Sequence, residues 1–224
     1  MNFSELPLLA NIRTLDFRTL ADRLAELGDI PPERIILAPH PGPATKDDVV
    51  ALCNATDKRL CELIEGVLVE KAKGIPESAL ALILSHELLT FVMAHKLGFV
   101  FGADGPIRFL TERIRMPDIS VILRERLPNG RLPNEQVLSF APNLAVEVLS
   151  PGNTVKEMLQ KREDYFAAGV TTVWEVTLPD QAIRVYSGVH EFVTLGIGDV
   201  LTGEPVLPGF QLPVKKLFAA LNGQ

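Results

Sequence analysis

Short apolar runs recur along the chain, and their lengths are typical of buried strands. They occupy residues 63–70, 99–101, 107–110, 119–123 and 144–149. Two further runs, at 173–177 and 183–186, flank Leu178-Pro179-Asp180-Gln181, a sequence typical of a hairpin turn. The pattern therefore predicts a sheet of several strands.

Two other segments carry apolar residues at helical spacing. Pro76 begins the first helix, which is expected to end near residue 96. Apolar side chains nearly surround this helix, which predicts a central and well-buried position. The second helix begins at a capping box at residues 154–157 and ends before Gly169.

The two ends of the chain are less regular. Helical patterning is weak in residues 1–57 and is interrupted by a proline-rich turn at 39–43. We expect residues 1–57 to form a loosely helical N-terminal extension, docked on a domain of residues 58–224. The tail of that domain is expected to be rich in loops and to end in a short helix near residues 214–221. The order of elements predicts an α/β fold, a mixed sheet flanked by helices.

Composition narrows the class of protein. The chain has 224 residues, 47% of them hydrophobic, and a formal net charge of −6. The acidic balance argues against a broadly basic surface and leaves room for a local basic groove. Cys53 and Cys61 are too few for a disulfide framework and suit buried thiols in a reducing cytosol. The most apolar stretch, 79–89, is too short to span a bilayer, so we expect a cytoplasmic protein without a membrane partner.

Several common catalytic motifs are absent from the sequence. There is no phosphate-binding P-loop, no dinucleotide-binding glycine fingerprint and no Gly-x-Ser-x-Gly elbow. The segment His86-Glu87-Leu88-Leu89-Thr90 fails as a zinc-protease motif because Thr90 stands in place of the second histidine. Candidate chemistry must therefore come from other residues.

Two predicted strands carry an acid where a core residue is expected. Glu147 lies inside the apolar run 144–149, and Asp118 stands at the start of the run 119–123. A buried carboxylate is costly unless it is paired or bound to a cation. If the two strands are adjacent, both acids converge and can hold a divalent cation. The alternative for each acid taken singly is a strand-start or edge-strand charge.

Two further charged residues are open to more than one interpretation. Lys161 lies about two turns into the capped helix, on a face shared with Glu157 and Tyr165. It either reaches back over the end of the 144–149 strand or is a solvated helix lysine. Glu62, taken alone, is interpreted as a surface charge.

A local excess of positive charge surrounds Asp118. Six arginines and three acids lie between residues 108 and 131, a local balance of +3. If a cation is bound at Asp118, we expect Arg124, Arg126 and Arg131 to hold substrate phosphates close to it. The alternative is a set of ordinary loop arginines.

An ordered set of motifs resembles one known family. The motifs are Cys61-Glu62-Leu63-Ile64-Glu65-Gly66-Val67, Pro117-Asp118-Ile119-Ser120, Val146-Glu147-Val148-Leu149-Ser150-Pro151, Lys161 with Tyr165-Phe166-Ala167-Ala168-Gly169, and Trp174. Together they resemble the Uma2-like family, formerly a domain of unknown function (DUF820), of the PD-(D/E)XK nuclease superfamily. The resemblance covers about residues 59–186, and 206–210 is similar to the family's C-terminal ending. It implies a restriction-endonuclease-like fold.

The resemblance also implies a function and a set of roles. It implies a Mg²⁺-dependent (or Mn²⁺-dependent) endonuclease acting on nucleic acid, and a homodimer. Asp118 and Glu147 then take the metal-binding positions, Lys161 is the catalytic lysine, and Glu62 matches the family's early glutamate. Leu149 stands where the superfamily lysine is usual, Cys61 replaces a tyrosine and Val67 replaces a glutamate. These departures keep an alternative open, a non-catalytic nucleic-acid-binding or interaction protein with a decayed nuclease site.

Overall fold

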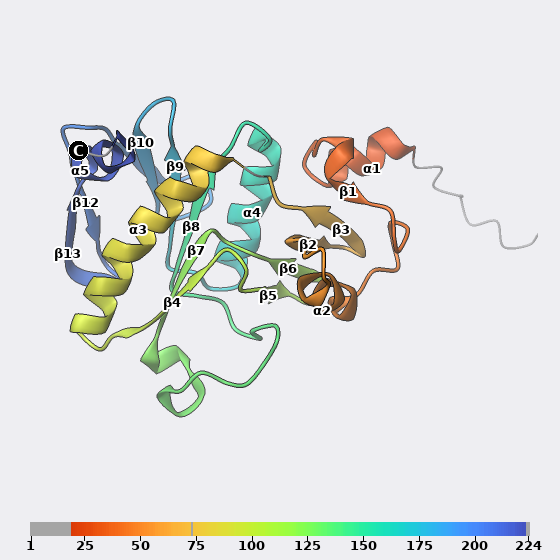
Figure 1. Ribbon diagram of the computed structural model, residues 1–224, viewed down its shortest axis with the longest axis horizontal. Helices are drawn as coiled ribbons and strands as arrows, with labels where there is room; N and C mark the ends of the chain where they lie inside the picture. The colour runs from red at the N-terminus through yellow and green to blue at the C-terminus, as the bar shows by residue number, and fades with distance from the viewer. Residues whose placement is uncertain (1–18, 73, 223–224) are drawn as a thin grey trace, which may run out of the picture.

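The computed structural model describes residues 19–72 and 74–222, which form sheets flanked by helices (Figure 1). The largest sheet has six strands in the order β11-β10-β9-β8-β7-β4. In that order they span Phe192–Leu195, Ala182–Tyr186, Thr172–Thr177, Leu144–Leu149, Ile119–Leu123 and Gly98–Gly102. β8 and β9 are parallel and the other neighbours are antiparallel. The expected mixed sheet and the hairpin of β9 and β10 are confirmed.

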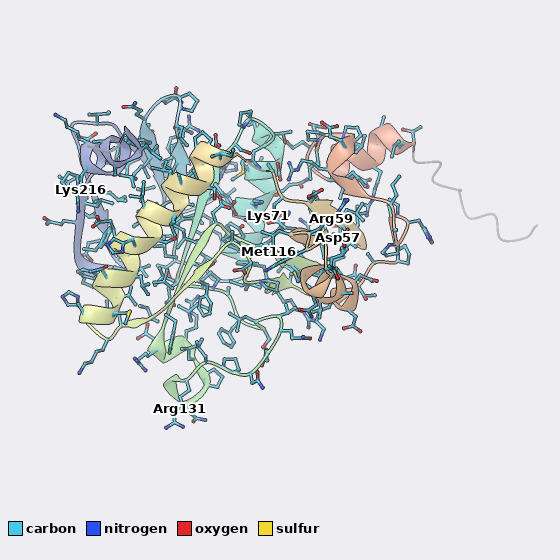
Figure 2. The ribbon with its side chains drawn as sticks, viewed as in Figure 1. Asp57, Arg59, Lys71, Met116, Arg131 and Lys216 are labelled. Atoms are coloured by element: carbon cyan, nitrogen blue, oxygen red, sulfur yellow. The ribbon has the colours of Figure 1, made fainter. Side chains whose placement is uncertain are left out.

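A second sheet of five strands lies beside the first. Its order is β1-β3-β2-β6-β5, spanning Ile35–Ile36, Val67–Glu70, Cys61–Ile64, Arg113–Arg115 and Ile107–Leu110. The small helices α1 (Leu20–Glu26) and α2 (Lys46–Asn54) lie near this sheet (Figure 1). Lys71 follows β3 and Met116 follows β6, and the two residues lie near one another in the middle of the molecule (Figure 2).

Two long helices cover opposite faces of the six-stranded sheet. Along β8, Val146 and Val148 share a core with α3 (Ile75–Ala94), whereas Ala145 packs with Tyr165 of α4 (Val155–Ala167). Alternate residues of a strand point to opposite faces. Glu147 therefore points to the side of α4.

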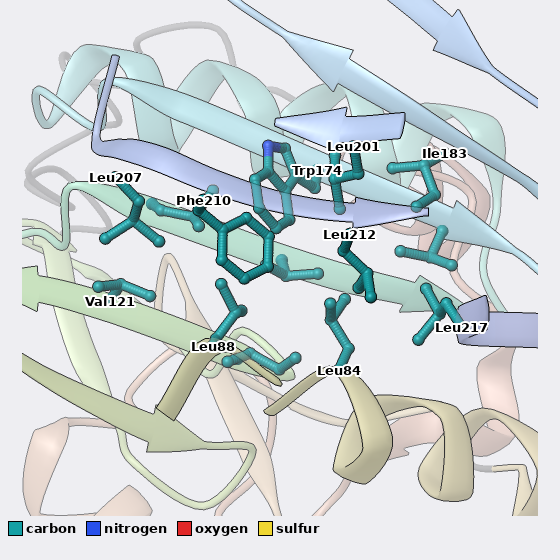
Figure 3. Packing of buried hydrophobic residues seen from close by; sticks show 14 of the residues in the cluster. Leu84, Leu88, Val121, Trp174, Ile183, Leu201, Leu207, Phe210, Leu212 and Leu217 are labelled. Atoms are coloured by element: carbon teal, nitrogen blue, oxygen red, sulfur yellow. The ribbon is translucent and has the colours of Figure 1, made fainter. Parts of the chain in front are cut away.

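The core on the α3 side also receives the C-terminal elements. These are β12 (Val200–Gly203), β13 (Leu207–Pro213), α5 (Val214–Ala219) and the short helix η4 (Ala220–Asn222). Figure 3 shows Phe210 and Leu212 of β13 packed with Trp174, Leu84 and Leu88. The tail was expected to be loop-rich. That expectation is wrong for β11, β12 and β13, while the final helix is confirmed.

The strand expected at 63–70 is in fact two strands. β2 and β3 form an antiparallel hairpin, in which Ile64 pairs with Val67 across the turn Glu65-Gly66. Both turn residues have positive φ, 49° and 76°, the combination required by the two-residue turns that match strand twist. Glu65 and Gly66 thus form the turn that separates β2 from β3.

The long helix is buried along one stripe only. Leu80, Leu84, Leu88 and Val92 are buried, whereas Leu82 is 72% exposed. The expectation of a helix buried all round is therefore wrong. Among the described residues, α3 is the one helix long and apolar enough to cross a membrane by length and composition, and its buried stripe packs on the sheet as in a core helix.

The described part of the N-terminal segment contributes to the five-stranded sheet. β1 pairs with β3, and Arg34 forms an ion pair with Glu157 of α4 at 2.7 Å. Val49 of α2 is buried against Leu63 and Leu68. The division into an extension of residues 1–57 and a domain of residues 58–224 stays a prediction, and residues 1–18 lie outside the described residues.

Three 3₁₀ turns complete the fold: η1 (Pro32–Arg34) precedes β1, and η2 (Arg124–Arg126) and η3 (Pro128–Gly130) follow β7. The latter two lie at the opposite end of β7 from Asp118.

Candidate active site

Asp118 and Glu147 come together because their strands are neighbours. Ile119 pairs with Val146 across the antiparallel β7–β8 ladder, so the residues just outside this pair face each other. The Asp118 Oδ2 atom accepts a hydrogen bond from the Val148 backbone N–H at 2.8 Å. The sequence expectation that the two strands lie side by side is confirmed.

Glu147 is held by two donors from α4. Its Oε2 atom lies 3.1 Å from Lys161 Nζ, and its Oε1 atom accepts a hydrogen bond from the Tyr165 hydroxyl. The capping box at Thr154 and Glu157 is formed as expected and fixes which face of the helix meets β8. Burial raises the pKa of Glu147 to about 7, and the charge of Asp118 adds to the rise while Lys161 opposes it.

Lys161 lies between two carboxylates rather than in solvent. It is 2% exposed, and its Nζ atom is 3.1 Å from Glu62 Oε1 as well as 3.1 Å from Glu147 Oε2. Burial acts to lower its pKa, but the charges of Glu147 and Glu62 outweigh that effect and raise it. The solvated-lysine alternative is therefore wrong.

Glu62 belongs to a buried ion cluster. It is 1% exposed, so its interpretation as a surface charge is wrong. Glu62 Oε2 lies 3.0 Å from Arg115 Nη1, and Arg115 also pairs with Asp164 of α4 at 2.7 Å. Burial alone would raise the pKa of Glu62, but the charges of Lys161 and Arg115 lower it to about 2. The cluster ties β2, β6 and α4 together behind Glu147.

A cavity of about 700 Å³ is lined by the acids Asp118 and Glu147 and by two lysines. Its polar lining includes Asp118, Glu147, Lys161, Lys71, Ser150 and Asn153. Its apolar lining includes Ile75, Ala79 and Leu82 from the first turns of α3, with Leu60 and Ala103. Concave sites that combine apolar walls with a few convergent charged groups are typical of ligand and active sites.

Lys71 is a residue of the site that the sequence did not identify as a candidate. Its Nζ atom lies 2.8 Å from Asp118 Oδ1 and also donates to the Met116 carbonyl. Along the chain it is simply a lysine at the end of a strand, and no spacing rule links it to Asp118. The position of β3 in the sheet is what brings it to the cavity.

The structure does not bring the expected phosphate-binding arginines to this cavity. Arg124 donates to the carbonyls of Lys96 and Gly130, and Arg126 donates to those of Ala141, Pro142 and Gly169. Arg131 is exposed and lies at the lower edge of the molecule, whereas Lys71 lies near its middle (Figure 2). Their role in nucleic-acid binding stays a prediction.

The pair of carboxylates has the chemistry to hold a small hard cation. Each oxygen of Asp118 and Glu147 has one hydrogen-bond or ion-pair partner among the contacts described above, and a carboxylate has about four lone-pair sites in all. In residues 19–72 and 74–222, no group of three or more His, Cys, Asp or Glu side chains is placed to hold a metal ion. Two carboxylates with water are nevertheless a usual set for Mg²⁺. The residues present therefore fit such a cation.

The fold and this cavity define a mixed α/β protein in which two acids on neighbouring strands line one cavity. Uma2, a family described as "Putative restriction endonuclease", matches residues 47–215, which is more than half of the chain. The chain therefore belongs to the Uma2 family, and membership supports a nuclease function.

One solved structure supports the fold independently. It is the crystal structure of "a putative nuclease belonging to DUF820" from Anabaena variabilis ATCC 29413. The two chains superpose with a TM-score of 0.64 at 22% sequence identity, over 72% of this chain and 90% of that one. No curated protein matches this chain.

Proposed function

We propose that this protein is a Mg²⁺-dependent (or Mn²⁺-dependent) endonuclease that hydrolyses phosphodiester bonds of nucleic acid. The observation that carries the proposal is the convergence of Asp118, Glu147 and two lysine ammonium groups on one cavity. Family membership supplies the reaction class. A divalent cation bound here would activate water and neutralise charge at the phosphorus.

The protein's own residues have separate roles in this proposal. Asp118 and Glu147 bind the cation. Lys161 and Tyr165 hold the Glu147 carboxylate in place, and Glu62 holds Lys161 from the other side. The catalytic roles that the resemblance implies for Lys161 and Glu62 stay predictions, and in this proposal both residues act through Glu147 as positioning residues. Partners of this kind typically change metal affinity or activity by 10- to 100-fold.

The decayed-site alternative predicts that the charged contacts around the acids have been lost. Two contacts argue against this alternative. Lys71 lies 2.8 Å from the Asp118 carboxylate, and Lys161 lies 3.1 Å from the Glu147 carboxylate. The departures from the family pattern at Cys61 and Val67 favour the alternative. A cleavage assay separates the two functions.

We expect the purified protein to cleave DNA or RNA when Mg²⁺ or Mn²⁺ is present and not when EDTA is present. The assay compares single-stranded and double-stranded substrates of both nucleic acids. The matched control is Glu147→Gln, which keeps the size of the side chain and removes its charge. Binding without cleavage at any metal concentration supports the decayed-site alternative instead.

We also propose that the protein acts as a homodimer in the cytoplasm. The part of α3 beyond the cavity wall supports the dimer, because His86, Leu89 and Met93 are exposed and follow the 3,4 spacing of a helix–helix seam. Cys53 and Cys61 are thiols that form no disulfide within the described residues, which suits a reducing compartment.

Leu89→Glu is expected to convert the dimer to a monomer, because it places a charge in the middle of this seam. Sedimentation velocity at matched concentrations measures the change. Phe192→Glu is the control, since Phe192 is also exposed and lies on the edge strand β11. A monomeric parent protein would contradict the homodimer.

A further inference from the structure

The cavity is lined by two lysines, and they differ in depth and in the charge of their partners. Lys161 is the deeper, 2% exposed against 8% for Lys71. Both contacts of the Lys161 ammonium described above are to carboxylates, Glu62 and Glu147. Its charge is therefore already balanced within the protein.

Lys71 has a different set of contacts. Its backbone N–H donates to the Leu60 carbonyl at 2.9 Å, which extends the β2–β3 ladder and fixes the start of the side chain. Its ammonium donates to Asp118 Oδ1 and to the Met116 carbonyl. An ammonium has three N–H donors, so one remains beyond two contacts in either lysine, but Lys71 has one carboxylate partner where Lys161 has two. Lys71 also lines the cavity.

We infer that Lys71 is the catalytic cation of this site, donating to a non-bridging oxygen of the scissile phosphate. The inference rests on the proposed nuclease function. Leu149 stands at the usual lysine position of the superfamily strand, and Lys71 brings an ammonium to the same pair of acids from β3 instead. Lys161 then serves to hold Glu147.

The chemistry of the reaction explains why the site needs a positively charged side chain in addition to the metal ion. A water oxygen forms a new bond to phosphorus, the ester P–O bond breaks, and the proton lost by water is balanced by the proton that the leaving oxygen takes up from solvent. Negative charge grows on the non-bridging oxygens in the transition state. A fixed ammonium beside them stabilises that charge, and Lys71 keeps its own protons throughout.

The test compares Lys71→Gln with the parent protein at saturating metal and saturating nucleic acid. Glutamine keeps a hydrogen-bond donor for the Met116 carbonyl and removes the charge. We expect kcat to fall by about 10²- to 10³-fold, as the loss of one transition-state donor typically does. Mn²⁺ affinity, measured by calorimetric titration, is expected to stay equal or become tighter, because Asp118 loses a competing cation.

Lys58→Met is the matched control, because Lys58 is an exposed lysine paired with Asp104, next to the Ala103 wall of the cavity. It is expected to leave kcat unchanged. If the Lys71→Gln variant does not fold, Lys71→Met is measured in the same way. A kcat within about threefold of the parent at saturating metal overturns the inference and leaves the nuclease proposal intact. A parent protein that cleaves no nucleic acid overturns both.

Discussion

Replacing Asp118 by asparagine is expected to abolish divalent-cation binding and cleavage together. Loss of a mere supporting partner of a metal ligand costs 10- to 100-fold in affinity, so loss of a ligand itself should cost at least about 100-fold. Asparagine also has only one acceptor oxygen, whereas Asp118 accepts from both Lys71 and Val148. Cleavage should fall by about 10³-fold or more, because the metal and the position of Lys71 are both affected.

Calorimetric titration with Mn²⁺ and a cleavage assay on the same sample measure these two effects. Asp104→Asn is the control, because Asp104 is an exposed acid near the same cavity, paired with Lys58 at 3.1 Å. Thermal unfolding of both variants shows whether the fold survives. A folded Asp118→Asn protein with unchanged Mn²⁺ affinity would remove Asp118 from the metal site.

Lys161→Met is expected to cause a large loss of stability. Lys161 is buried between Glu62 and Glu147, and breaking a buried ion pair by removing one partner typically costs about 3–5 kcal/mol. For a chain of this length, a loss of that size lowers Tm by about 6–20 °C. Denaturant unfolding followed by circular dichroism gives the free energy of unfolding directly.

The matched control for this prediction lies on the same helix. Lys156 is exposed and its nearest carboxylate is that of Asp29, at 3.7 Å. Lys156→Met should change the free energy of unfolding by no more than about 0.5 kcal/mol. If Lys161→Met is as stable as Lys156→Met, the two carboxylates are not held by Lys161 in solution, and the positioning role is wrong.

The strands and acids at the centre of the site could be predicted because each carries a strong local signal. An acid inside an apolar run, such as Glu147, has few stable explanations other than a partner or a cation. The capping box at 154–157 sets the phase of α4, which places Lys161 and Tyr165 on the face that meets β8. The local sequence predicts that Lys161 and Tyr165 share a helix face, whereas the structure shows that this face meets β8.

The remainder depends on contacts between distant segments. The sequence around Arg115 gives no sign that this arginine is buried. It is fully buried because its partners Glu62 and Asp164 lie on two other elements, β2 and α4. The same reason applies to Lys71, because its partner Asp118 is 47 residues away along the chain. The β2–β3 turn was missed for a different reason: Glu65 is not a residue typical of positive φ, so only Gly66 marks the hairpin.

The measurement that tests the central claim most directly is the location of Mn²⁺ in crystals of the protein soaked at saturating metal. The anomalous signal of manganese identifies the ion without reference to activity. The account predicts one peak between Asp118 and Glu147, within about 2.0–2.6 Å of an oxygen atom of each. Saturated crystals in which no manganese lies between these two carboxylates would contradict it.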